Sequence, residues 1–392
     1  MIYIYHHFFQ LNSNIMKVLV VISKFLPEYS GPSVRISNLY LRLIKKKYIT
    51  TKNVYILSGG EELNSTKLFR VKSLKVKRFK NTNVSNNGIN FINYVKNFLL
   101  VRKEINYFKP DLIHVIGSNI LTASAIINAK NKNIPLCLEL VNSSARPNQN
   151  FPILKYFWRP NLNENSKIIV ISKFLKKKCL LMGYKNVWYR PNPIRLDKFK
   201  KINNIKSKNK ILLNVGQFIP RKNQNFLIKI IKFLPNNFKL ILCGPLVSKG
   251  NKKRRDLEYF KNIKDYIKSN KLTQKIIVIP KYVNMIKYFK KTSIYLMPSS
   301  EEGLGNTLIE SLASGIPVIA NSSIPSFREI IKNNKNGFLV KMQAKLWAKS
   351  IIRNINTLSS KKVRSNSKDI LEQSDEIKID NNYIKIFKKL IN

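Results

Sequence analysis

The stretch that most constrains the fold is residues 298–317, with the sequence PSSEEGLGNTLIESLASGIP. An apolar run at 293–297 precedes it and is short enough to form a buried parallel strand. After the loop, apolar residues recur at helical spacing, at Leu308, Ile309, Leu312 and Ala313. Gly315 and Pro317 then end the helix. The sequence therefore predicts a buried strand, a glycine-containing loop and a helix in immediate succession.

This succession predicts an anion-binding site, because unpaired N–H groups and the positive end of the helix dipole face the same crevice. Two carboxylates flank it, Glu302 in the loop and Glu310 in the first turns of the helix. Carboxylates repel anions, but they suit the hydroxyls of a sugar or ribose attached to a phosphate, which favours a sugar-nucleotide site. The alternative is that Thr307 and Glu310 only form a capping box and that Glu302 is a solvated loop acid.

Residues 302–310, followed by SLASGIPVIA at 311–320, resemble the E-x7-E signature of the family 4 retaining glycosyltransferases. Members of that family have the GT-B fold, in which two Rossmann-like domains face each other across a cleft. The resemblance implies that Glu302 contacts the hydroxyls of the donor sugar and that Glu310 holds the ribose of the nucleotide. The donor diphosphate would meet the backbone amides between them, in Gly303, Leu304, Gly305, Asn306, Thr307 and Leu308.

A second stretch, GQFIPRKN at 216–223, follows an apolar run at 211–215. It resembles the family's loop in which an arginine and a lysine bind the donor diphosphate. Lys222 matches the lysine, but Gln217 stands where the arginine is expected and Asn223 where a glycine is expected. We expect Arg221 to supply the missing charge and Gly216 to lie beside the substrate. Cations in this place would stabilise the departing nucleoside diphosphate.

The first predicted strand, at 18–22, leads through a loop into a helix predicted at 34–44, which is a Rossmann-like opening. The resemblance places the family's small-residue turn, which approaches the donor phosphate or the acceptor, at Gly31. The alternative is an ordinary turn.

A further resemblance lies at 109–117, KPDLIHVIG, where the family has a proline, an aspartate, two apolar residues and a histidine. It places His114 near the cleft, whereas the alternative is a structural histidine at the end of an apolar strand. Many relatives carry another histidine after the next strand, here at 134–141, poised over the sugar. This chain has Glu139, Val141 and Asn142 in that region instead.

Strands and helices alternate through both halves of the chain, which predicts a parallel α/β class. We expect a disordered extension at 1–15 and an N-terminal Rossmann-like, acceptor-binding domain at 16–195. A C-terminal Rossmann-like domain that binds the nucleotide-sugar would follow at 196–375. A helix at 376–392 would return to the N-terminal domain, as in the GT-B fold.

The 392 residues include 72 Lys+Arg against 20 Asp+Glu, a formal net charge of +52. Such a charge suits nucleic acid or anionic lipid. Basic residues are spread evenly, however, with 34 in residues 1–200 and 38 in residues 201–392, which argues against a dedicated nucleic-acid face. Basic residues also alternate with apolar ones at 67–80, which predicts an edge strand. That segment either faces a membrane or lipid-linked acceptor or is a solvated edge.

The resemblance implies a retaining, metal-independent hexosyltransferase that uses a nucleotide-diphospho-sugar and no cofactor. Its acceptor would be a glycan or a lipid-linked sugar, in cell-envelope polysaccharide or lipopolysaccharide synthesis. There is no apolar run of the roughly 18 residues that a membrane-spanning helix needs. We expect a cytoplasmic protein, peripheral on the inner face of the plasma membrane. The rival interpretations are a GT-B-fold sugar-nucleotide epimerase and a basic nucleic-acid-binding protein.

Overall fold

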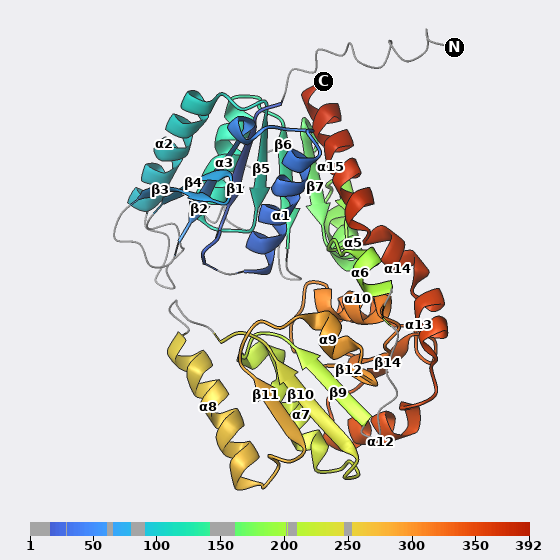
Figure 1. Ribbon diagram of the computed structural model, residues 1–392. Coiled ribbons are helices and arrows are strands. Elements are labelled where there is room, and N and C mark those ends of the chain that lie inside the picture. Colours follow the sequence, from blue (N-terminus) through green and yellow to red (C-terminus); the bar gives the residue numbers. More distant parts are fainter. Residues whose placement is uncertain are drawn as a thin grey trace, which may run out of the picture.

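The computed structural model describes residues 16–28, 30–60, 66–79, 91–141, 161–200, 202, 210–246 and 253–392 (Figure 1). Within these ranges the chain forms two α/β domains, each built on its own largely parallel sheet. This arrangement confirms the predicted fold class. The extension predicted at 1–15 lies outside the described residues.

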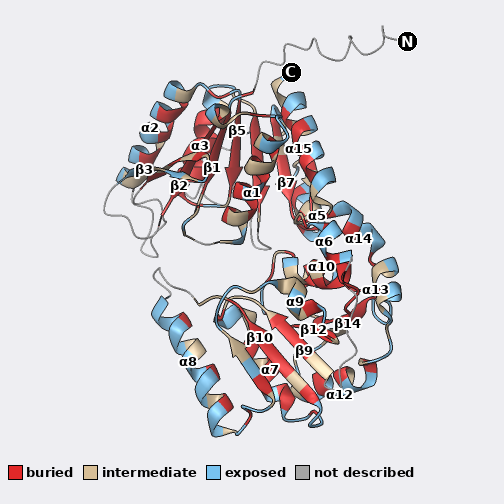
Figure 2. Ribbon diagram, viewed as in Figure 1, coloured by how far each residue is buried: buried red, intermediate tan, exposed pale blue. Residues whose placement is uncertain are grey.

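Eight strands form the sheet of the N-terminal domain, in the order β3-β4-β2-β1-β5-β6-β7-β8. Their bounds are β1 (Val18–Ile22), β2 (Val54–Gly59), β3 (Lys67–Val71), β4 (Leu74–Phe79), β5 (Leu112–Ile116), β6 (Leu136–Leu140), β7 (Ser166–Val170) and β8 (Val187–Tyr189). The pair β3–β4 is antiparallel, and every other pair is parallel. The central strands are buried along their whole length, as the continuous apolar runs in the sequence require (Figure 2).

The edge strand predicted at 67–80 is a hairpin of two strands. Lys72 sits in the turn between β3 and β4 with a φ of 53°. β3 is the outer strand, and its Lys67 and Arg70 are exposed. A lysine-lined edge of this kind discourages pairing with another sheet.

Helices cover both faces of this sheet. One face packs on α1 (Gly31–Lys45) and α15 (Glu376–Ile391), and the other on α2 (Phe91–Phe108) and α3 (Ile120–Asn131) (Figure 1). The helix predicted at 34–44 begins three residues earlier, at Gly31. Ser30 and Ser33 form a capping box there, which satisfies N–H groups before the apolar pattern starts.

Six parallel strands form the sheet of the C-terminal domain, in the order β11-β10-β9-β12-β13-β14. Their bounds are β9 (Lys210–Val215), β10 (Phe238–Cys243), β11 (Ile276–Ile279), β12 (Ile294–Met297), β13 (Val318–Asn321) and β14 (Gly337–Val340). The helices between 220 and 354 are η2 (Pro220–Lys222), α7 (Gln224–Ile231), α8 (Lys253–Ser269), α9 (Met285–Phe289), α10 (Asn306–Ala313), α11 (Pro325–Ile330) and α12 (Ala344–Asn354). α7 and α12 share one core cluster with β9, β10 and β12.

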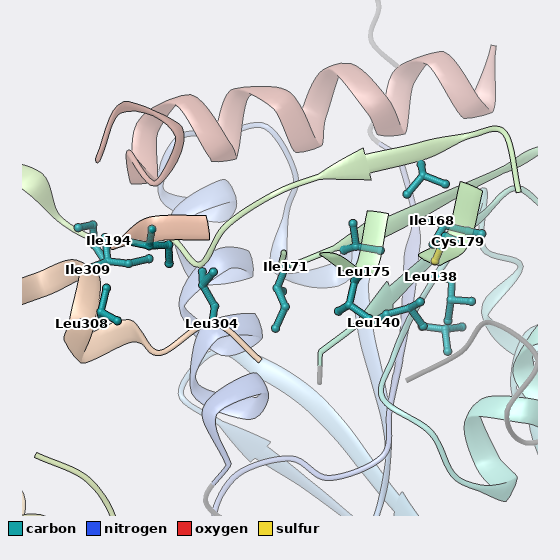
Figure 3. Packing of buried hydrophobic residues seen from close by; sticks show 14 of the residues in the cluster. Leu138, Leu140, Ile168, Ile171, Leu175, Cys179, Ile194, Leu304, Leu308 and Ile309 are labelled. Atoms are coloured by element: carbon teal, nitrogen blue, oxygen red, sulfur yellow. The ribbon is translucent and has the colours of Figure 1, made fainter. Parts of the chain in front are cut away.

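The two domains are packed together as well as linked by the chain. One apolar cluster runs from β7 through Ile171 and Leu304 into α10 (Figure 3). Glu329 of α11 accepts hydrogen bonds from the backbone N–H groups of Lys173 (2.8 Å) and Phe174, at the start of α5 (Lys173–Leu181). The segment between the domains holds α6 (Leu196–Lys200).

After α13 (Ser360–Asn366) and α14 (Lys368–Gln373), the chain returns to the N-terminal domain as α15 (Figure 1). The buried carboxylate of Asp380 on α15 pairs with Arg42 (2.9 Å) and Lys46 (3.0 Å) at the end of α1. The returning C-terminal helix predicted from the resemblance is thus confirmed. Among the helices that the structure describes, none is long and apolar enough to span a bilayer.

Candidate active-site cleft

A cavity of about 670 Å³ lies between the two domains, and residues of both contribute to its wall. The C-terminal domain contributes the ends of β9 and β10, the 3₁₀ turn η2 and the loop before α10. The N-terminal domain contributes the start of α1 and single residues after β6 and β7. Of the residues predicted from the sequence, ten line this cavity: Gly31, Gly216, Arg221, Lys222, Glu302, Gly303, Leu304, Gly305, Asn306 and Thr307.

The start of α10 is fixed by its glycine and by a tyrosine beneath it. Gly305 precedes the helix with a φ of +86°, and a Cβ there would lie 2.8 Å from Met297 Cε. The Tyr295 hydroxyl lies 2.6 Å from Thr307 Oγ1 and 3.1 Å from the carbonyl oxygen of Val215. These contacts join the end of β9 to the first turn of α10. The alternative that Thr307 and Glu310 form a capping box is wrong, because Gly305 is the N-cap residue.

The first N–H groups of α10 are free of intrahelical partners, as at any helix N-terminus. Those of Asn306 and Thr307 belong to residues on the cavity wall. The N–H of Leu308 donates instead to the Gly305 carbonyl at 3.2 Å, and the Leu308 side chain is fully buried. The structure therefore does not bring Leu308 to the cavity, in contrast to its predicted contact with the diphosphate.

The predicted cations and carboxylate meet on this wall. Lys222 Nζ forms an ion pair with Glu302 Oε1, and Ser299 Oγ donates to the same oxygen at 3.0 Å. Arg221 Nη1 lies 3.9 Å from Glu302 Oε2. The Lys222 side chain packs beside Gly216, where a Cβ would stand 3.4 Å from Lys222 Cδ. The aliphatic part of Lys222 therefore packs directly against Gly216, and a Cβ there would still make ordinary van der Waals contact with it.

Asn223 shows why the chain can depart from the family's glycine at this position. Its φ is 56° and its ψ is 38°, the left-handed conformation between η2 and α7. Glycine adopts this conformation freely, and asparagine is the residue that tolerates it best after glycine. The backbone turn that presents Lys222 is therefore kept.

Glu310 lies one turn inside α10 and is half-buried, outside the residues that line the cavity. Burial raises the pKa of its carboxyl from 4.5 to about 7. Within the described part of the chain its carboxylate has no hydrogen bond or ion pair. Its contact with a ribose stays a prediction.

His114 is not at the cleft, and its predicted contact with a substrate is corrected. Its side chain is fully buried within β5, under α1 and α15. Nδ1 lies 2.8 Å from the Tyr40 hydroxyl and Nε2 lies 3.1 Å from Glu139 Oε1. Because both ring nitrogens have partners in the interior, the histidine is structural, as the alternative interpretation held.

Sequence reasoning missed several residues of the wall. Arg35, Val141, Ile171 and Asn192 line it from the N-terminal side, and Met285 lines it beyond β11. Arg35 could have been found, because it lies one helical turn after Gly31 and such residues share a face. Asn192 donates a hydrogen bond across the cleft to the Asn306 side chain. That contact joins residues 114 positions apart, and no local pattern indicates it.

Comparison with known proteins agrees with this geometry. The Glycosyl transferases group 1 family matches residues 196–369. An uncharacterized glycosyltransferase of Methanocaldococcus jannaschii is 27% identical over 330 residues, which cover 83% of this chain and 84% of that protein. The capsular polysaccharide biosynthesis glycosyltransferase CapH of Staphylococcus aureus is 26% identical over 288 residues, 72% of each chain.

The fold is similar to that of Anabaena HepE, whose structure was solved in complex with UDP and glucose. The TM-score is 0.69 at 15% identity, over 95% of this chain and 99% of that one. Residues 196–369 therefore match the Glycosyl transferases group 1 family, and the chain is a glycosyltransferase with the GT-B fold.

Proposed function

We propose that the protein is a family 4 retaining glycosyltransferase that moves a hexose-type sugar from a nucleotide-diphospho-sugar to a glycan or lipid-linked acceptor. The observation that carries the proposal is the meeting of Lys222, Arg221 and Glu302 with the start of α10 on one cavity wall. The similarity to a capsular polysaccharide glycosyltransferase supports a role in cell-envelope polysaccharide synthesis.

In this proposal the donor diphosphate lies against Lys222, Arg221 and the N–H groups of Asn306 and Thr307. Negative charge develops on the leaving diphosphate as the bond from the sugar C1 to the phosphate oxygen breaks. Fixed cations and helix N–H groups stabilise that charge without reorganisation. They do so without a metal ion or other cofactor.

Glu302 would orient the sugar by accepting hydrogen bonds from its hydroxyls. Its carboxylate is held by Lys222 and Ser299, which suits a positioning group better than a nucleophile. We therefore propose a front-face displacement, in which the acceptor oxygen forms its bond to C1 on the face that the diphosphate leaves. The acceptor proton passes to the departing phosphate oxygen, and the configuration at C1 is retained.

The protein would work in the cytoplasm, peripheral on the inner face of the plasma membrane. A net charge of +52 supports attraction to anionic lipid headgroups. The exposed basic residues of β3 lie on the N-terminal domain, where the acceptor is expected.

The test measures the release of nucleoside diphosphate from a panel of UDP-, GDP- and dTDP-sugars. Proton NMR early in the reaction identifies the anomer of the released or transferred sugar. We expect one nucleotide class to turn over with retention. Lys222→Ala and Glu302→Gln should each lower the rate at least about 100-fold, as loss of a group that stabilises the transition state does. Lys229→Ala removes an exposed lysine from α7 and is the matched control. Inversion at C1, or full activity of Lys222→Ala, would contradict the mechanism.

The epimerase alternative gains no support from the geometry. An epimerase would place acid and base groups such as histidines and carboxylates around the sugar. His114 is buried and hydrogen-bonded away from the cavity, and the described lining residues include no histidine.

A further inference from the structure

Arg35 on α1 is a buried arginine that faces the cavity from the acceptor side. It lines the cavity and is 7% exposed. Nη2 pairs with Glu139, whereas Nη1 is buried without any hydrogen-bond partner. A buried donor without an acceptor costs free energy, so such groups occur where they are used.

The charge around Arg35 is not balanced. Glu139 is fully buried, and its Oε2 accepts from both Arg35 and Arg190, the latter at 3.1 Å. Its Oε1 faces His114 Nε2 and the Tyr383 hydroxyl. Burial lowers the pKa of His114, so this ring is neutral. Two guanidinium groups therefore share one carboxylate, and one positive charge remains beside the cavity.

The position of Arg35 separates it from the other cations on the cavity wall. Arg221, Lys222 and Lys281 all come from the C-terminal domain. The described lining residues from the N-terminal domain are Gly31, Pro32, Arg35, Val141, Ile171 and Asn192, among which Arg35 is the one charged side chain. The shared carboxylate of Glu139 also fixes its direction, so little side-chain freedom is lost on binding.

We propose that Arg35 recognises a phosphoryl group of the acceptor, so that the substrate glycosylated by this enzyme is a phosphate- or diphosphate-bearing sugar or lipid. Because Nη1 is inaccessible to solvent, the guanidinium would turn about its contact with Glu139 to bring the two free N–H groups of Nη1 to phosphoryl oxygens, a charge-assisted contact that guanidinium geometry favours. The inference rests on the proposed function, because it assigns the donor diphosphate to Lys222 and Arg221 on the opposite wall.

The test uses the full chain and isothermal titration calorimetry, with inorganic pyrophosphate as the probe. The donor site is first saturated with the nucleoside diphosphate that binds best among UDP, GDP and dTDP. Pyrophosphate should then bind at a second, saturable site. Arg35→Gln should weaken that binding at least about tenfold, the usual effect of losing one charge-assisted contact, and leave nucleoside diphosphate binding within twofold. Lys222→Ala should do the reverse.

Arg42→Gln is the matched control. Arg42 lies two turns further along α1, carries the same charge and pairs with Asp380 and Glu376 away from the cavity. It should leave both titrations unchanged. If circular dichroism shows that Arg35→Gln does not fold, Arg35→Lys is used in its place to test the proposal. It keeps the charge beside Glu139 but lacks the Nη1 donors, and it should weaken pyrophosphate binding about threefold or more.

Three results would overturn the inference. If pyrophosphate binds Arg35→Gln, or Arg35→Lys where that variant replaces it, as tightly as the wild type, the binding reflects only attraction to a basic surface. Loss of nucleoside diphosphate binding in the Arg35 variant would place this residue at the donor. If pyrophosphate fails to bind while the nucleotide is bound, the proposed second site does not exist. Failure of all three nucleoside diphosphates to bind would instead count against the proposed function.

Discussion

Glu310 illustrates how one residue in the predicted site can be tested through its ionisation. Its folded pKa is about 7 because of burial, against an ordinary value of 4.5. Between these values the folded state binds more protons than the unfolded state, so stability falls as pH rises from about 4.5 to 7. Above pH 7 the carboxyl is ionised in both states and the loss is complete.

Glu310→Gln cannot ionise and should escape this loss. Its free energy of unfolding relative to the wild type should rise by about 2 kcal/mol between pH 4.5 and pH 8. Urea denaturation at several pH values measures this difference, with Glu301→Gln, an exposed carboxylate in the preceding loop, as the control. A difference between Glu310→Gln and the wild type that stays constant over this range would contradict the assigned burial.

The residues of the cleft were predicted unevenly, for physical reasons. Glycines and charged residues in the strand–loop–helix stretches at 216–223 and 302–307 were found because the motif is continuous in sequence. His114 was misplaced because an apolar strand hides whether its histidine points to the cleft or to the interior. Arg35 was missed because its significance depends on Glu139 in β6 and on Arg190 just after β8, both far away in the sequence.

At the scale of elements, the turn into α10 depends on one glycine. Alanine at Gly305 would have to adopt a φ of +86° and would bring its Cβ to 2.8 Å from the buried Met297 Cε. We expect Gly305→Ala to lower the free energy of unfolding by about 1–3 kcal/mol. Gly31→Ala is the matched comparison, because a Cβ there meets nothing within 4 Å and no left-handed φ is required. Chemical denaturation of both variants measures the effect, and equal losses would contradict the account of this turn.

Helices could be predicted from the sequence where the apolar pattern spans several turns. The helix predicted at 34–44 is observed at Gly31–Lys45, because its apolar residues recur over several turns. α13 escaped prediction, since Val363 is its one buried residue and no periodicity results. Contacts made by Arg364 hold it instead, with the guanidinium donating to the carbonyl oxygens of Ala313, Ser314 and Ile202.

At the scale of the whole molecule, the sequence pattern predicted two parallel α/β domains, and the resemblance predicted how they face each other. The contacts that hold the domains together were not predictable. Glu329 caps the start of α5 from a distance of more than 150 residues, and the cluster around Leu304 and Ile171 joins loops of different domains. Such contacts depend on where loop residues lie in the folded protein, which no periodic pattern in the sequence indicates.

The excess of positive charge allows a test of directed membrane binding. If the edge at β3 faces the membrane, Lys67→Gln, Arg70→Gln and Lys72→Gln together should weaken binding to phosphatidylglycerol vesicles at least about tenfold, since each basic residue near the surface contributes about 1 kcal/mol. Vesicle sedimentation at several salt concentrations measures this. The control removes the exposed Lys253, Arg254 and Lys261 of α8. Equal weakening by both sets would show that the charge acts without direction.

The central claim is that the cavity between the domains binds a nucleotide-diphospho-sugar through Lys222 and the start of α10. The most direct measurement is isothermal titration calorimetry of the full chain with UDP-, GDP- and dTDP-sugars, for the wild type, Lys222→Ala and Lys229→Ala. The account predicts saturable one-to-one binding of one nucleotide class, weakened at least about tenfold in Lys222→Ala and unchanged in Lys229→Ala. Absence of binding to every donor, or equal affinity in Lys222→Ala and the wild type, would contradict it.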